Sequence, residues 1–134
     1  MTVSRLRVAD PELEEAYSAA TDEARIVAAR ETARAAVRLS GVNDAAVLAA
    51  LDKGSSTDVA AVVEGLDQRY FQLEEEEGRS VQSLRLFSQA RAAAAVQFVQ
   101  SGKPAESLYE AICSTGNPQL LRMVAFGFLR GAAV

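Results

Sequence analysis

Four consecutive glutamates, Glu74–Glu77, form the densest run of charge in the sequence, and Arg79 lies just beyond them. Such a run could attract a basic partner protein through electrostatic steering and surface ion pairs. Its structural alternative is a solvated helical turn. Carboxylates are favourable at the positive N-terminal end of a helix and unfavourable at its C-terminal end. We therefore expect Glu74–Glu77 to open a helix, and we take these four residues as the candidate partner-binding site.

The C-terminal segment is the second candidate, because only Arg122 and Arg130 interrupt its run of apolar residues. A helix that is apolar on every side belongs in a core or is covered by another chain. Both interpretations remain open here: packing within the chain, or an interface with a second copy or a partner. The candidate apolar interface comprises Leu120, Leu121, Met123, Phe126 and Phe128.

Groups for catalysis and metal binding are scarce. The chain has no histidine, which removes the usual general base near neutral pH and the commonest transition-metal ligand. Its one cysteine, Cys113, excludes an internal disulfide and a cysteine-based zinc site, and we interpret it as a buried structural thiol. Gly54-Ser55-Ser56 could bind an anion on free backbone amides, but turn and cap chemistry is the preferred interpretation. We expect no cofactor, no metal and no enzymatic activity.

Composition narrows the class of protein further. The net charge of −4 argues against binding to nucleic acid. No stretch reaches the roughly 18 uncharged apolar residues of a membrane span, and the first ten residues lack the apolar core of a secretory signal. The excess of alanine, and of arginine over lysine, indicates a GC-rich and bacterial genome. These features predict a cytoplasmic protein without a membrane partner.

The elements that would position these residues are predicted to be helices. Residues 1–9 are expected to form an extended or disordered arm, with Leu6 and Val8 on one side. Apolar residues then recur at helical spacing, and Ser-Gly, Gly-Ser and Pro interrupt them. The pattern predicts an all-α single domain over residues 1–134, a compact bundle of about six helices. We expect these helices to begin near Asp10, Asn43, Ser55, Glu74, Pro104 and Pro118.

The two halves of the sequence align when it is shifted by about 61 residues. Ser40-Gly41 then falls on Ser101-Gly102, and apolar positions such as Val47 and Leu108 coincide. One interpretation is an internal duplication of two stacked units, 10–72 and 73–134, each with a long, a short and a medium helix. The other is a chance alignment of similar amphipathic helices. The helix–break–helix rhythm resembles helical-repeat proteins of the HEAT and armadillo type.

Two functional hypotheses follow. The first is a non-enzymatic protein–protein interaction module that binds another, basic protein and could form a homodimer. A small acidic adaptor, an immunity-type inhibitor and a secretion chaperone all fit this description. The alternative is a helical domain that binds a small molecule in an apolar pocket between helices. Its candidate lining is aromatic and consists of Tyr17, Phe87, Phe98 and Tyr109.

Overall fold

The computed structural model describes residues 4–53 and 58–131 of the chain. These residues form eight compactly packed helices and no strand, so the prediction of an all-α fold is confirmed, although six helices were expected. The helix start expected near Ser55 and the anion-binding alternative at Gly54-Ser55-Ser56 lie outside the described residues. The helices are α1 (Arg5–Ala9), α2 (Pro11–Ala19), α3 (Asp22–Ser40), α4 (Ala45–Lys53), α5 (Val59–Glu77), α6 (Val81–Gln100), α7 (Pro104–Cys113) and α8 (Gln119–Arg130).

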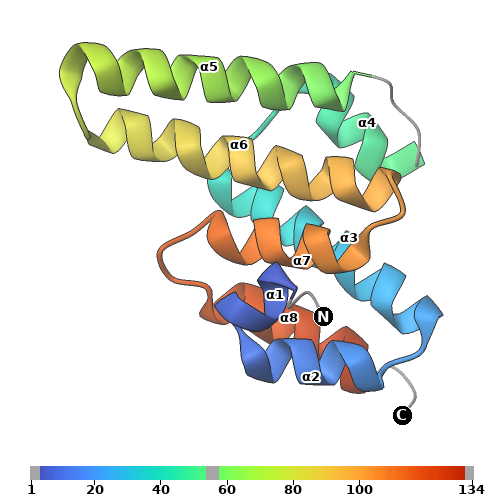
Figure 1. Cartoon of the computed structure of the whole chain (residues 1–134). Coiled ribbons are helices and arrows are strands. Elements are labelled where there is room, and N and C mark those ends of the chain that lie inside the picture. Colours follow the sequence, from blue (N-terminus) through green and yellow to red (C-terminus); the bar gives the residue numbers. More distant parts are fainter. Residues whose placement is uncertain (1–3, 54–57, 132–134) are drawn as a thin grey trace.

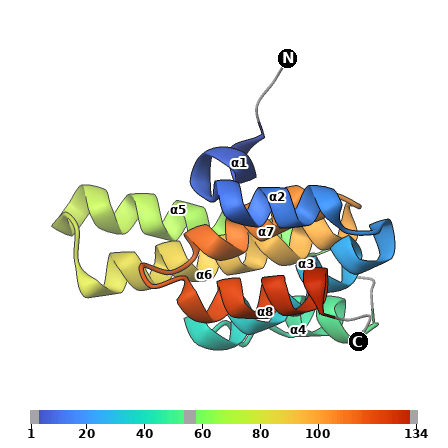
Figure 2. The same ribbon diagram turned by 90° about the horizontal axis from the view of Figure 1, so that it is seen from below.

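Two long helices, α3 and α6, pack against each other at the centre of the fold. Helix α5 lies along α6, while α8 lies along α3. Helix α7 contacts both central helices, and the N-terminal pair α1 and α2 covers α7 and α8 (Figure 1). Figure 2 shows the same arrangement from below, with the turn between α5 and α6 projecting beyond the other helices.

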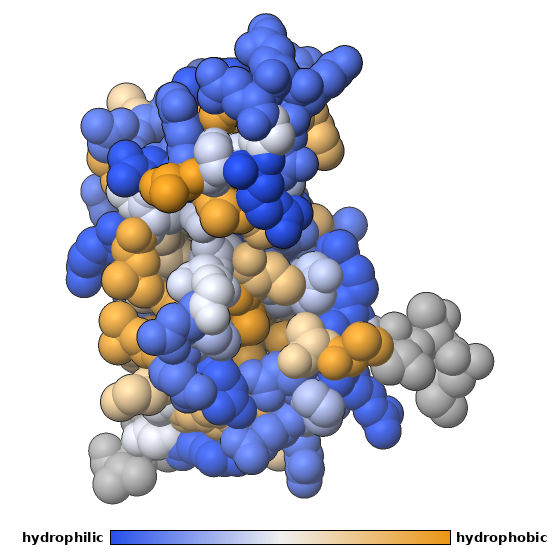
Figure 3. Space-filling view, turned by 90° about the vertical axis from the view of Figure 1, so that its left-hand side faces the viewer, coloured by the Kyte–Doolittle hydropathy of each residue, from blue (hydrophilic) through white to orange (hydrophobic). Residues whose placement is uncertain are grey.

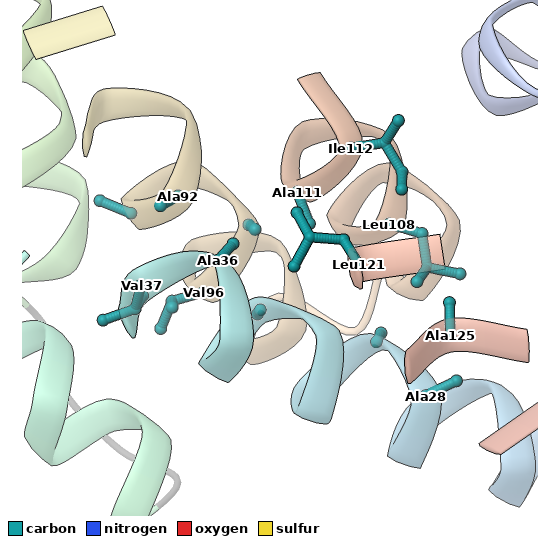
Figure 4. Packing of buried hydrophobic residues seen from close by; sticks show 14 of the residues in the cluster. Ala28, Ala36, Val37, Ala92, Val96, Leu108, Ala111, Ile112, Leu121 and Ala125 are labelled. Carbon is teal, nitrogen blue, oxygen red and sulfur yellow. The ribbon is translucent and has the colours of Figure 1, made fainter. Parts of the chain in front are cut away.

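The interface between the central helices is built largely from alanine. Buried alanines line α3, and the run 92–95 on α6 is buried throughout. Small side chains allow two helix backbones to approach closely, since the interaxial distance depends on the residues at the contact. Larger apolar side chains fill the spaces where a third helix joins, and Figure 4 shows Leu121 of α8 pointing toward Ala111 of α7. The core is therefore tight at its centre and filled by leucines toward α7 and α8.

Several helix ends lie where the sequence predicts them. Gly41 follows α3 with a φ of 80°, and its amide donates to the carbonyl of Val37. Gly102 follows α6 with a φ of 72°. Glycine reaches this left-handed region without the steric penalty of a Cβ atom, which explains why both helices end there. Pro11 and Pro104 each occupy the first turn of the helix that they open.

The sequence predicts one long helix from Asp10, and this prediction is wrong. The chain breaks at Ala20 and Thr21 and forms two helices, α2 and α3. The Thr21 side chain accepts a hydrogen bond from the amide of Ala24 and so begins α3 as its N-cap. Arg25 then reaches back and donates to the carbonyls of Tyr17 and Ser18, at 2.8 Å each. The Tyr17 carbonyl also accepts from the amide of Ala20, so Arg25 adds to the bonds that satisfy the last carbonyls of α2.

Residues 1–9 were expected to form an extended or disordered arm, and this prediction is wrong for residues 5–9, which form α1. Ser4 caps this short helix by accepting from the amide of Arg7. Leu6 is buried whereas Val8 is exposed, although residues two apart would share one face of a strand. The helical conformation separates them, and burial of Leu6 beside α2 and α7 holds the segment in place.

Asp10 joins the N-terminal helices to α8. Its Oδ1 accepts from the Leu13 amide at 3.1 Å, and its Oδ2 accepts from Arg122 Nε at 2.6 Å. We expect Asp10→Ala to lower the free energy of unfolding by about 1–2 kcal/mol, the usual effect of losing a buried N-cap. Asp10→Asn keeps a side-chain oxygen that can accept the cap hydrogen bond, so its free energy of unfolding is expected to fall by less. Urea denaturation of both variants would measure the difference, and equal losses would assign the effect to the ion pair.

Candidate functional site

The four glutamates Glu74–Glu77 end α5 and do not open α6, so the expectation that they begin a helix is wrong. Helix α6 begins at Val81 with its own cap, in which Ser80 and Ser83 exchange side-chain to backbone hydrogen bonds. The turn between the two helices runs through Gly78, whose φ is 74°. We call Glu74–Glu77 together with this turn the acidic tip. It lies at the end of the projecting α5–α6 hairpin (Figure 1).

The electrostatics of the acidic tip are unfavourable for the isolated chain. The last carbonyls of a helix carry partial negative charge, and here they meet four carboxylates. Glu74 has Arg79 Nε at 3.8 Å, and Glu76 accepts a hydrogen bond from Gln72 at 3.4 Å. Glu75 and Glu77 are exposed and form no ion pair within the described residues. The tip therefore projects a concentrated negative potential into solvent.

Apolar side chains lie in the same part of the hairpin. Phe71, one turn before Glu75 on α5, is 65% exposed, and Val81 at the start of α6 is 79% exposed. Leu84 is exposed one turn further along α6. In Figure 3 the top of the molecule, over the ends of α5 and α6, is mostly hydrophilic with apolar atoms at its margins. The hairpin end thus combines negative charge with exposed apolar area.

A surface hollow of about 370 Å³ lies next to Phe71, between α1, α5, α6 and α7. Aromatic rings and charged side chains line it together, and we call it the charged hollow. Its lining residues are Arg5, Asp67, Tyr70, Phe71, Phe87, Arg91, Tyr109, Glu110 and Cys113.

Ion pairs between helices form one wall of the charged hollow. Arg91 of α6 donates to Asp67 of α5 at 2.9 Å and to Glu110 of α7 at 3.0 Å. The Glu110 side chain is only 5% exposed, so its carboxylate depends on these partners for solvation. Arg91 thereby connects three helices through one guanidinium group.

Arg5 of α1 occupies the other side of the charged hollow. Its guanidinium pairs with Glu106 and lies 3.9 Å from Glu110. The same group stacks over the ring of Tyr109, 4.5 Å from its centroid. The hollow therefore already holds one arginine side chain from a separate element of the chain.

Two groups in the charged hollow, Glu110 and Cys113, have raised pKa values. Burial raises the pKa of Glu110, and the nearby Arg91 offsets this effect only in part. Burial likewise raises the pKa of the Cys113 thiol, and the hydrogen bond with Tyr109 opposes that rise. A thiol with a raised pKa is a poor nucleophile at neutral pH. Cys113 was expected to be buried, but it is only half-buried.

The aromatic residues expected to line one ligand pocket do not gather. Phe87 and Tyr109 line the charged hollow, while Tyr17 lines a separate hollow of about 350 Å³ between α2, α3 and α6. Phe98 lines neither of them. The hydrogen-bonded acids and arginines of the charged hollow were missed from the sequence. The available signal was Arg91, which lies one turn after Phe87 and directly before the alanine run of α6.

The candidate apolar interface on α8 divides into buried and exposed parts. Leu121 is buried, and Phe126 and Phe128 are half-buried. Leu120 is 50% exposed and Met123 is 70% exposed. Ala125 and Leu129 continue the buried face beside α3. Helix α8 is therefore a core helix on one side and leaves an apolar strip open on the other.

In the described ranges, no three acidic, histidine or cysteine side chains are placed so that they could hold a metal ion. None of the described helices has both the length and the apolar character needed to cross a membrane. Comparisons with protein-family models, with curated proteins and with solved structures found no match to this chain.

Proposed function

We propose that this chain is a non-enzymatic protein-interaction module that receives a basic segment of another protein at the acidic tip. An adaptor, an immunity-type inhibitor and a chaperone remain alternatives within this class. The observation that supports the proposal is the position of Glu74–Glu77 at the negative end of α5. Residues that cost stability in the isolated chain are expected at functional sites.

The proposal explains both properties of the hairpin end. Concentrated negative charge on a projecting element steers a basic partner and raises its association rate. Exposed Phe71 and Val81 would then contribute apolar contact area once the partner is in place. The partner should accordingly carry basic residues beside at least one apolar side chain.

The triple variant Glu75→Gln, Glu76→Gln and Glu77→Gln tests this proposal. Affinity capture from the native host with the wild-type chain should recover a basic protein in stoichiometric amount, and the variant should not. The variant should also unfold at a higher urea concentration, because each removed carboxylate relieves about 0.3–1 kcal/mol of repulsion with the helix end. A loss of binding with a gain in stability cannot be attributed to unfolding.

The matched control removes the same charge elsewhere, at three exposed glutamates on α2, α3 and α5: Glu15→Gln, Glu23→Gln and Glu64→Gln. The control variant should still capture the partner protein from the native host. Equal loss of capture by both variants would show that net charge, and not the acidic tip, governs binding. Undiminished capture by the tip variant would refute the proposed site.

Internal duplication is the second part of the proposal. The shift of 61 residues places Gly41 on Gly102, both at positive φ, and Val47 on Leu108, both fully buried. The boundary expected between residues 72 and 73 falls inside α5, so the equivalent units would be α3–α5 and α6–α8. The two units pack on each other in an equivalent way. The last helix of each unit lies on the first helix of the other, α5 on α6 and α8 on α3.

A further inference from the structure

The charged hollow has the chemistry of a receptor for a guanidinium group. Carboxylates from α5 and α7 face it, and rings from α5, α6 and α7 line it. Planar guanidinium groups form hydrogen bonds with carboxylates and stack on aromatic faces, a combination that a lysine ammonium group does not match. Both arginines already in the hollow adopt these contacts: Arg5 stacks over Tyr109, and Arg91 lies 5.9 Å from the Phe87 centroid.

The two arginines differ in how firmly they are held. Arg91 forms the wall of the hollow and is bonded to two carboxylates. The Arg5 side chain is 52% exposed and belongs to α1, a helix of five residues. Exposed ion pairs contribute little to stability, so the Arg5 side chain can change its conformation while buried Leu6 keeps α1 in place. Arg5 can therefore leave the hollow while Arg91 stays.

Departure of Arg5 would change the charge of the hollow. Glu106 would lose the arginine that it pairs with, and Glu110 would keep only Arg91. One face of the Tyr109 ring would become free of its cation. Another guanidinium group could then take over the two contacts of Arg5, the Glu106 carboxylate and the Tyr109 ring. The exposed ring of Phe71 lines the same hollow.

We propose that the charged hollow binds an arginine side chain of the partner protein, and that Arg5 of α1 occupies this place until the partner displaces it. This inference rests on the proposed function, because it assigns a specific residue type to the same basic partner. The hollow adjoins Phe71 on α5, one turn before the acidic tip. A segment bound at the tip could thus extend along α5 and place one arginine in the hollow.

The probe for this test is N-acetyl-arginine methylamide, with the neutral isostere N-acetyl-citrulline methylamide as its control. NMR shifts of the ring resonances of Tyr70, Phe87 and Tyr109 report binding in the hollow. We expect citrulline to bind about tenfold more weakly, since hydrogen bonds between charged groups are the stronger kind. Equal shifts with both compounds would overturn the proposal.

Arg5→Gln should strengthen binding of the arginine probe about two- to fivefold, which is the competition expected from an exposed ion pair. Arg7→Gln removes an exposed arginine from the same helix and should leave the affinity unchanged. Adding Glu106→Gln to Arg5→Gln should abolish the gain. An unchanged affinity in Arg5→Gln, or an equal gain in Arg7→Gln, would contradict displacement.

The acidic-tip variant separates this inference from the proposed function. Glu75→Gln, Glu76→Gln and Glu77→Gln together should leave arginine binding in the hollow unchanged while abolishing capture of the partner. If the tip variant fails to capture the partner and the wild-type hollow does not bind the arginine probe, only the inference about the hollow fails. If the hollow binds arginine but capture is unaffected by the tip, the tip proposal fails and the hollow remains a binding site.

Discussion

Replacing Arg91 by methionine is expected to lower the free energy of unfolding by about 3 kcal/mol, the lower end of the range for breaking a buried ion pair. The variant leaves the Glu110 carboxylate, which is 5% exposed, with only Arg5 at 3.9 Å. An uncompensated buried charge is costly, and partial exposure of Arg91 and Asp67 keeps the effect from being larger. Urea denaturation with an unchanged m value would measure the loss.

The double variant Arg91→Met with Glu110→Met distinguishes charge from packing. It removes both members of the buried pair and fills the space with apolar side chains, a change that is often close to neutral. We expect the double variant to be more stable than Arg91→Met alone. The difference is the coupling energy of a double-mutant cycle, for which Glu110→Met supplies the remaining corner. A double variant as unstable as the single one would show that Arg91 acts through Asp67 or through its own packing.

Truncation of Leu121 to alanine is expected to cost about 3 kcal/mol, because a fully buried leucine loses its contacts and leaves a cavity. The side chain lies where α8 meets α3 and α7, among alanines that cannot expand to fill the space (Figure 4). Thermal and urea unfolding of the variant would both report the loss.

Leu120→Ala provides the matched control for Leu121, since it removes the same atoms from the adjacent residue of α8. Leu120 is half exposed, so the cost should stay within about 0.5 kcal/mol, as for most surface substitutions. An equal cost at both positions would indicate that another chain covers the open strip of α8. The sedimentation behaviour of the wild-type chain would then have to be that of an oligomer.

The sequence correctly predicted the helix ends that depend on a single glycine or proline. Pro11 and Pro104 fix their own φ, and Gly41 tolerates the left-handed conformation that ends a helix, so these effects do not depend on the rest of the fold. Thr21 was missed because the apolar spacing continues through it, although Thr-Asp-Glu is a helix start in its own right. The short α1 was missed because its helical state depends on burying Leu6 against distant elements.

The acidic run shows which effect dominates when two local preferences conflict. The dipole rule carries a few tenths of a kcal/mol per charge and favoured placing Glu74–Glu77 at a helix start. Packing of α5 along α6, with Tyr70 against Phe87 at 5.5 Å between ring centroids, extends α5 through the glutamates. The helical conformation of Glu74–Glu77 could be predicted from the sequence, but their position at the negative end of α5 could not.

The charged hollow lay beyond sequence reasoning for a different reason. Its ion pairs join residues that are far apart in the chain: Arg91 lies 24 residues from Asp67, and Arg5 lies 101 residues from Glu106. No periodicity brings such residues together; only the tertiary arrangement of α1, α5, α6 and α7 does so.

The pairing of α3 with α8 affects how the chain matures during synthesis. Helix α3 precedes α6, α7 and α8 in the chain, and all three pack against it. Until these helices are made, the buried alanines of α3 have no lasting cover, and contacts between such distant segments form late because closing long loops is entropically costly. Chains that stop before Gln119 lack α8, so they should leave part of α3 uncovered and depend on chaperones to stay out of aggregates.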